Sequence, residues 1–157
     1  MKIPKTADDL RDSFLKFFES KEHLILPSSS LIPSEDPSLL LTNSGMAQFK
    51  SYFSGEKKPP NKRITTAQKC FRTTDIEEVG DDTHLTFFEM LGNFSFGDYF
   101  KNEACAWALE YMTEVLKFDI NRLFFTIYNE DDEAKQIWLD LGISEKYIYK
   151  FGDEDNW

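Results

Sequence analysis

Two apolar runs separated by a charged segment constrain the fold of this chain more than any other feature. The first run, residues 64–71, reads ITTAQKCF, and the second, residues 84–91, reads HLTFFEML. Both are short and rich in β-branched or aromatic residues, which is typical of strands. The acidic connection around residues 75–82 is too long for a tight hairpin turn. We therefore predict two paired strands joined by a long loop, and such loops often carry function.

Arg72 directly follows the first run, and aromatic residues crowd the second. A guanidinium can clamp a phosphate through two parallel hydrogen bonds, and an aromatic ring can offer its face to a purine. The sequence contains neither a GxxxxGK(S/T) nor a GxGxxG motif, so we expect side chains on the strands to hold any nucleotide. The alternative is that Arg72 forms only a surface salt bridge with Asp75 or Glu77.

The rest of the chain mixes helical and strand patterns without a regular βαβ alternation. Helices are predicted at residues 6–20, 44–53, 102–116 and 131–141, and strands at residues 23–26, 38–42, 123–128 and 147–151. Thr6 and Asn102 are the expected caps of the first and third helices. This pattern favours an α+β fold with a largely antiparallel sheet, and a length of 157 residues suits one domain.

The net charge of −10 disfavours loose binding to a nucleic acid backbone, but the charge is unevenly distributed. Residues 56–72 are basic and residues 119–155 are strongly acidic, so a polyanionic partner is expected to meet the first region. Composition alone favours the interpretation that its lysines and Arg63 simply keep a loop solvated. Cys70 and Cys105 suggest neither a disulfide framework nor a zinc site. No apolar run is long enough to span a membrane, and we expect a soluble, cytoplasmic protein.

Three segments resemble the catalytic domain of the alanyl-tRNA synthetase family. They are TNSGMAQFK at residues 42–50, QKCFR at 68–72 and HLTFFEMLGNFSFGDYF at 84–100. The resemblance implies a class II synthetase domain over residues 1–157, an antiparallel sheet flanked by helices, with motif 1 at about 6–42 and motif 2 at about 64–91. It also implies ATP-dependent activation of alanine to alanyl-adenylate and transfer to tRNA(Ala). The alternative is a non-catalytic synthetase-like module that binds nucleotide, tRNA or a partner protein.

The resemblance also implies roles for individual residues. Arg72 is expected to contact the α-phosphate of ATP and the alanine carboxylate, and Phe88 to stack on adenine. Glu89 and Met90 would line the adenine edge, partly through their backbone, and the residues expected at the alanine pocket are Met46 and Trp157. Mg²⁺ normally bridges the phosphates of ATP, and fixed positive charge offsets the repulsion between the two anionic reactants. No metal ligand in this chain is implied.

Other residues near this stretch are expected to have structural roles. His84 is interpreted as a strand-edge or supporting residue rather than a ligand. Aromatic residues after the second run are expected to pack in the core, namely Phe94, Phe96, Tyr99 and Phe100. Asp75, Glu77 and Glu78 are interpreted as a solvated loop face, with positioning of Mg²⁺ or Lys69 as the alternative.

The sequence also departs from the family pattern. The loop after Arg72 is shorter than usual and lacks the lysine- and histidine-bearing segment, for which Lys69 or the Lys57–Lys62 group are possible substitutes. We expect the chain to end before motif 3, the editing domain with its zinc ligands and the oligomerisation domain. The expectation is therefore an N-terminal part of the catalytic domain that is inactive or nearly so alone, with an exposed sheet edge.

Overall fold

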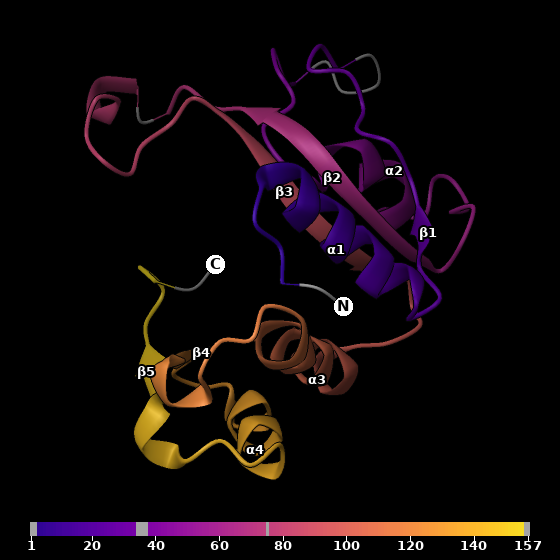
Figure 1. Cartoon of the computed structure of the whole chain (residues 1–157). Helices are drawn as coiled ribbons and strands as arrows, with labels where there is room; N and C mark the ends of the chain where they lie inside the picture. The colour runs from indigo at the N-terminus through magenta and orange to yellow at the C-terminus, as the bar shows by residue number, and fades with distance from the viewer. Residues whose placement is uncertain (1–2, 34–37, 75, 156–157) are drawn as a thin grey trace. The chain divides into compact units, whose positions relative to one another are not determined.

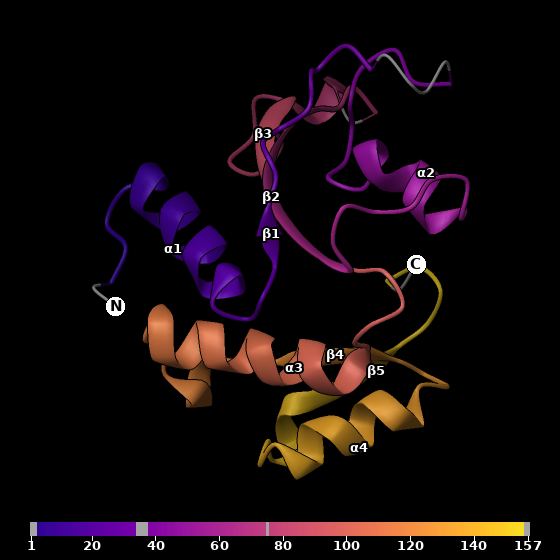
Figure 2. The same ribbon diagram turned by 90° about the vertical axis from the view of Figure 1, so that its right-hand side faces the viewer.

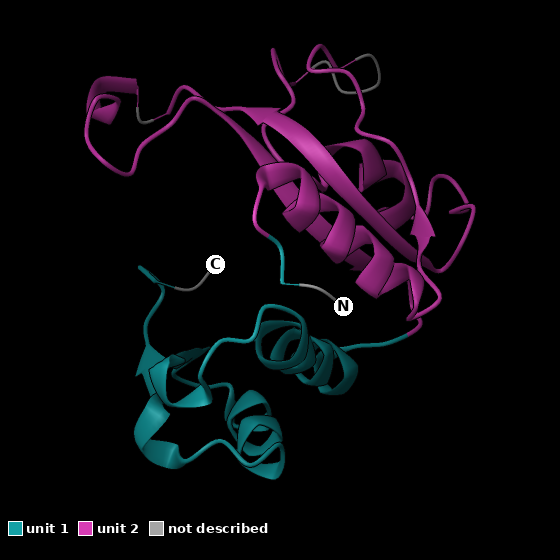
Figure 3. Cartoon of the chain, in the orientation of Figure 1, with its two compact units in different colours: residues 1–4, 99–157 teal, residues 5–98 magenta. Residues whose placement is uncertain are grey.

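The computed structural model describes residues 3–33, 38–74 and 76–155. The chain divides into two compact units, shown in different colours in Figure 3. The sheet unit comprises residues 5–98 and contains the predicted pair of strands. The C-terminal unit comprises residues 99–157 together with residues 1–4.

A three-stranded sheet forms the centre of the sheet unit (Figure 1). Its strands are β1 (Leu24–Ile25), β2 (Arg63–Phe71) and β3 (Phe87–Ser95), in the order β1-β2-β3. β2 and β3 pair antiparallel along their whole length, while β1 pairs parallel with β2. The predicted pairing of the two runs is therefore confirmed, but β3 begins later than residue 84. The reason is that the backbone N–H of His84 donates to the carboxylate of Asp81, 2.7 Å away, and so continues a turn.

Helix α1 (Ala7–Glu19) covers one face of this sheet. The Thr6 hydroxyl accepts a hydrogen bond from the backbone N–H of Asp9, and the Asp9 carboxylate accepts one from the backbone N–H of Thr6. This reciprocal capping box confirms Thr6 as the helix cap. The buried face of α1 carries Phe14, Phe17 and Phe18, as the helical spacing predicts.

The opposite face of the sheet is covered by a short helical segment, η1 (Ala47–Phe49) followed by α2 (Lys50–Phe53). Figure 2 shows α1 and α2 on opposite sides of the strands. Phe49 is buried, with its ring centroid 4.8 Å from that of Phe94 and 6.0 Å from that of Phe96. Phe94 and Phe96 therefore pack in an aromatic cluster, as expected.

The predicted buried strand at residues 38–42 is wrong. The described residues of this segment form a turn and bends, and Leu40 is 94% exposed. Thr42 is anchored, because its N–H donates to the carbonyl of Leu31 and its own carbonyl accepts from the N–H of Phe71. Two isolated hydrogen bonds to different segments replace the continuous ladder that a strand requires.

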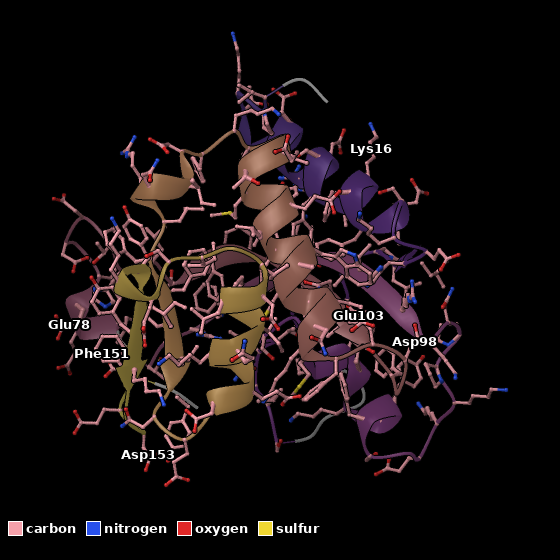
Figure 4. All side chains as sticks on the ribbon, turned by 90° about the horizontal axis from the view of Figure 1, so that it is seen from below. Lys16, Glu78, Asp98, Glu103, Phe151 and Asp153 are labelled. Atoms are coloured by element: carbon pink, nitrogen blue, oxygen red, sulfur yellow. The ribbon has the colours of Figure 1, made fainter. Side chains whose placement is uncertain are left out.

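The C-terminal unit contains α3 (Lys101–Glu110), which continues as the π-helical segment η3 (Tyr111–Val115). Helix α3 begins one residue before Asn102, so the prediction that Asn102 caps it is wrong, and Glu103 lies in its first turn (Figure 4). Tyr99 is buried against Trp107, as expected, but Phe100 is 73% exposed and is not a core residue.

The second half of this unit is a strand–helix–strand arrangement. Its elements are η4 (Ile120–Arg122), β4 (Phe125–Tyr128), α4 (Asp132–Asp140), η5 (Glu145–Tyr147) and β5 (Ile148–Phe151). β4 and β5 pair in parallel, and Figure 4 labels Phe151 at the end of β5. The chain combines helices with a sheet whose longest strand pair, β2 with β3, is antiparallel, and this confirms the α+β class. The pairs β1–β2 and β4–β5 are parallel. Within the described ranges, none of the helices has the length and apolar character that crossing a membrane requires.

Candidate functional site

The candidate site is a pocket of about 240 Å³ at the end of the β2–β3 ladder. Figure 1 shows the connection between β2 and β3 extending beyond this end of the sheet, with the short helix η2 (Ile76–Glu78) in it. The connection returns to the ladder where the N–H of Arg72 donates to the carbonyl of Thr86 over 2.9 Å. The pocket is lined by Arg72, Val79, Thr83, His84, Leu85 and Phe88.

Arg72 is held in this pocket by two contacts. Its Nε donates to the carbonyl of Asn43 over 2.8 Å, and its guanidinium carbon lies 5.2 Å from the centre of the Phe88 ring. Among the described residues, no carboxylate lies within ion-pair distance of Arg72, so the predicted alternative of a salt bridge with Glu77 is wrong. Asp75, the other alternative partner, lies outside the described residues. A positioned cation without a counter-charge is suited to bind an anion.

Phe88 lies on the pocket side of β3, whereas Phe87 points to the other side and is 47% exposed. Adjacent residues of a strand face opposite sides, and the hydrogen-bonded register pairs Phe88 with the buried Cys70. The structure therefore brings together Arg72 and Phe88, two residues that the sequence singled out separately.

Glu89 points away from the pocket, toward α1. Its two carboxylate oxygens accept hydrogen bonds from Arg11, with Nε 3.1 Å from Oε1 and the terminal nitrogen 2.6 Å from Oε2. The Glu89 side chain is therefore engaged in joining β3 to α1, and only its backbone remains for the predicted adenine contact. Glu77 and Glu78 are exposed and do not line the pocket, in agreement with the predicted solvated loop face.

Met90 lies on the same side of β3 as Phe88, but outside the pocket lining. Its sulfur accepts a hydrogen bond from the N–H of Gly45 over 3.1 Å, so it contacts the segment that carries Met46. Met46 is 46% exposed and does not line the pocket either. Trp157, the other residue expected at the alanine pocket, lies outside the described residues.

His84 is a pocket residue that the sequence interpretation assigned to a supporting position. Its Nδ1 lies 2.7 Å from Oδ2 of Asp81, whose other oxygen accepts from the N–H groups of Thr83 and His84. These hydrogen bonds, that from the His84 backbone first, hold the pKa of Asp81 far below its usual range. The signal available in the sequence was the Asp-x-x-His spacing at residues 81–84, which is typical of a side-chain-capped turn.

A larger cavity of about 550 Å³ lies between residues 29–33 and α2. Two of its hydroxyl groups are already hydrogen bonded, because Thr42 donates to the carbonyl of Ser30 and Ser29 donates to the amide oxygen of Gln68. Its lining includes Lys50 and Glu56, which carry opposite charges. The smaller pocket is the better candidate, since it places the Arg72 guanidinium, which has no carboxylate partner among the described residues, beside an aromatic ring.

The described residues show neither a cluster of metal ligands nor a reactive thiol. Across residues 3–33, 38–74 and 76–155, no group of three or more histidine, cysteine, aspartate or glutamate side chains is placed to hold a metal ion. Burial raises the pKa of both thiols, so Cys70 and Cys105 favour the unreactive protonated form.

Comparison of the sequence with known proteins shows the family of this chain. The family model described as "tRNA synthetases class II (A)" matches residues 9–157. The curated "Alanine--tRNA ligase" of Caldicellulosiruptor saccharolyticus is 60% identical over 153 residues, which cover 96% of this chain and 17% of the relative. The protein of the same name from Acetivibrio thermocellus is 60% identical over 151 residues, covering 95% of this chain and 17% of the relative.

A third relative, the "Alanine--tRNA ligase" of Dehalococcoides mccartyi, is 56% identical over 151 residues, covering 96% of this chain and 17% of the relative. The chain thus spans about a sixth of the length of the curated relatives that it matches. The family match runs through both compact units without interruption. The chain therefore belongs to the class II (A) tRNA synthetase family.

Proposed function

We propose that this chain contributes part of the ATP site of an enzyme that activates alanine to alanyl-adenylate and transfers it to tRNA(Ala). One observation carries the proposal: the Arg72 guanidinium, without a carboxylate partner among the described residues, lies 5.2 Å from the centre of the Phe88 ring in one pocket. The names of the curated relatives supply the amino acid and the tRNA. We extend this proposal to motif 1 at about residues 6–42 and motif 2 at about residues 64–91.

The proposed reaction requires positive charge more than it requires a nucleophile from the protein. The alanine carboxylate attacks the α-phosphorus of ATP, and pyrophosphate leaves as the new carboxyl–phosphate bond forms. The two anionic groups repel each other, and a fixed guanidinium offsets this repulsion in the ground state and in the transition state. Arg72 is held by the carbonyl of Asn43, so little reorganisation is needed when the reactants meet.

The size of the pocket indicates which part of the nucleotide it holds. Complete small-molecule sites have volumes of about 300–1,000 Å³. The pocket here, at about 240 Å³, fits a part of ATP. We assign adenine to Phe88 and the backbone of Glu89 and Met90, and the α-phosphate to Arg72.

Thr83 and His84 form the polar wall of the same pocket. We assign to them the phosphate contacts that the shortened loop would otherwise lack, in place of Lys69. The Asp81 carboxylate orients His84 through the 2.7 Å contact with Nδ1. We assign Mg²⁺ to the phosphates of ATP, where it would offset their negative charge.

Binding of ATP and of a stable alanyl-adenylate analogue, measured by isothermal titration calorimetry, tests the proposal. Arg72→Lys keeps the charge but loses the planar fork, and we expect it to weaken binding of both ligands at least tenfold. Phe88→Leu removes the stacking face and is expected to weaken binding about fivefold or more, a loss of about 1 kcal/mol. Glu78→Gln, an exposed change in the same loop, is the matched control and should have no effect.

An ATP–pyrophosphate exchange assay with alanine complements the binding measurement. We expect nucleotide binding with little exchange, because Met46, the described candidate for an alanine contact, does not line the pocket. A wild-type chain that binds neither ligand at millimolar concentration, or an Arg72→Lys variant that binds both as tightly as wild type, would contradict the proposal.

A further inference from the structure

A surface at the other end of β3 combines lysines with one exposed aromatic ring, Phe53, and one partly buried ring, Phe96. We call it the aromatic–basic patch and define it by Phe53, Lys57, Lys58, Lys62 and Phe96. The connection between α2 and β2 folds back on its neighbours, because the N–H of Lys57 donates to the carbonyl of Ser51 over 2.9 Å. At the far end of the connection, the carbonyl of Lys62 accepts from the N–H of Phe96 over 2.8 Å. These contacts hold the backbone of Lys57 and Lys62 next to the segments that carry Phe53 and Phe96.

The patch is positively charged, although the chain as a whole has a net charge of −10. Many of the described basic side chains are paired with carboxylates, and these are Arg11, Arg63, Lys101, Lys117, Lys135 and Lys150. Lys58 and Lys62 are exposed, and neither forms an ion pair with a described residue. Glu56 is the single acidic residue between α2 and β2. Lys58 and Lys62 therefore carry positive charge that no described carboxylate neutralises.

The aromatic part of the patch is anchored on one side and open on the other. The Phe53 ring centroid lies 4.7 Å from that of Phe96 and 6.4 Å from that of Phe94, yet Phe53 remains 48% exposed. Phe96 also contacts Tyr52 edge-on, with ring centroids 5.7 Å apart. A rigidly held, half-exposed ring among lysines is the combination that proteins use to bind single-stranded nucleic acid.

We propose that the aromatic–basic patch binds a single-stranded segment of RNA, with phosphates on Lys58 and Lys62 and an unstacked base on Phe53. A single strand is favoured over a duplex because only an unpaired base can offer its face to Phe53. The choice of RNA over DNA rests on the proposed function.

The patch is separate from the candidate ATP pocket. Phe88 and Phe96 are eight positions apart along β3 and its extension, which corresponds to about 26 Å at about 3.3 Å per residue. One molecule can therefore occupy the patch while a nucleotide occupies the pocket, and the two sites can be tested independently.

Fluorescence anisotropy with a labelled 12-nucleotide single-stranded RNA, titrated with this chain at several salt concentrations, tests the inference. Each lost lysine–phosphate contact is expected to weaken binding about fivefold at 0.1 M salt and to reduce the salt slope by about 0.7. Lys58→Gln/Lys62→Gln should therefore bind about 25-fold more weakly. The matched control, Lys5→Gln/Lys16→Gln, removes the same charge from two exposed lysines at α1 and should change affinity less than twofold.

Phe53→Leu tests the stacking contact, because leucine preserves apolar packing against Phe96 but has no aromatic face. We expect at least fivefold weaker RNA binding with an unchanged circular dichroism spectrum. The inference is overturned if single-stranded RNA does not bind at 50 mM salt, or if the control variant loses as much affinity as the patch variant. It is also overturned if a duplex of the same sequence, or vesicles containing phosphatidylserine, bind more tightly than the single strand.

Arg72→Lys separates this inference from the proposed function. We expect this variant to bind RNA as wild type does while losing nucleotide affinity. RNA binding without any nucleotide binding would contradict the proposed function alone, whereas nucleotide binding without RNA binding would contradict the patch alone.

Discussion

At the scale of single residues, two of the buried polar side chains of β2, Gln68 and Thr66, differ in whether their polar atoms are hydrogen bonded. The amide oxygen of Gln68 accepts hydrogen bonds from the N–H of Ser29 and from the side chain of Gln48, each over 2.8 Å. Thr66, two positions earlier, is fully buried, and its hydroxyl has no hydrogen-bond partner among the described residues. A buried hydroxyl without a partner costs free energy, whereas a satisfied amide does not.

Thr66→Val should therefore stabilise the fold. The change replaces an unpartnered hydroxyl with a methyl group of similar size, and we expect the free energy of unfolding in urea to rise by about 1 kcal/mol. Thr65→Val is the matched control, since the Thr65 hydroxyl donates to the carbonyl of Gly92 over 3.0 Å. The control should lower stability, and an equal loss in both variants would show that the Thr66 hydroxyl is satisfied.

Gly92 lies where β3 needs a residue without a side chain. A Cβ atom at this position would lie 2.7 Å from the Phe94 ring, which is itself packed against Phe49 and Phe53. Gly92→Ala must displace this ring, and we expect a loss of about 1–3 kcal/mol in unfolding free energy. Gly152→Ala, where the new Cβ would lie 3.7 Å from the side-chain nitrogen of Asn129, serves as the control and should be close to neutral. Equal stability of the two variants would contradict this account.

At the scale of elements, α1 and β3 are joined across the sheet by a charged hydrogen-bonded pair. Arg11 donates to both carboxylate oxygens of Glu89 and also to Asp8, and the carboxylates raise the pKa of Arg11 further above its ordinary value. Because strand residues alternate, anchoring Glu89 to α1 turns Phe88 and Met90 to the opposite face, where the pocket lies. Contact with α1 therefore helps to fix which face of β3 is turned toward the pocket.

The start of α1 depends on its capping box. Thr6→Ala removes the hydroxyl that accepts from the N–H of Asp9, and we expect the unfolding free energy to fall by about 1 kcal/mol. Thr6→Ser keeps that hydroxyl and should retain most of the stability. Urea titrations followed by circular dichroism compare the two. Equal losses in both variants would mean that packing of the threonine methyl, and not the cap, matters here.

At the scale of the whole molecule, ionisable groups make stability depend on pH. Burial lowers the pKa of His23, whose Nδ1 hydrogen donates to the carbonyl of Phe18 over 3.0 Å. Hydrogen bonds lower the pKa of several carboxyl groups, from backbone N–H groups at Asp9, Asp81 and Asp119 and from lysine side chains at Asp131, Asp132 and Glu145. In every case the folded state binds protons less readily than the unfolded state.

Stability should therefore fall on acidification in two stages. In the unfolded chain His23 takes up a proton at the ordinary pKa of 6.5, before it does so in the fold, so stability declines as the pH drops below that value. Below about pH 4 the unfolded carboxylates take up protons first, and stability declines again. Thermal unfolding between pH 8 and pH 3 measures both stages. His23→Gln should abolish the first stage only, and a variant that retains it would exclude His23 as its source.

The candidate site shows how far local sequence signals reach. Arg72 and Phe88 could be singled out because one ends an apolar run and the other lies in an aromatic return strand. Their 5.2 Å contact depends on the antiparallel register, which no single segment contains. The sequence could not predict the orientation of Glu89, because it is set by the distant residue Arg11. It could not predict the place of His84 in the pocket either, because that depends on the turn at Asp81.

The sequence by itself determined the local structure of this protein and its family resemblance. Periodicity, capping residues and apolar runs act over a few neighbouring positions, and they sufficed for α1, its Thr6 cap and the pairing of β2 with β3. Tertiary structure alone decided that residues 38–42 do not form a strand and that β4 pairs in parallel with β5. The physical reason is that such pairings depend on hydrogen bonds between distant segments, as at Thr42 with Leu31 and Phe71.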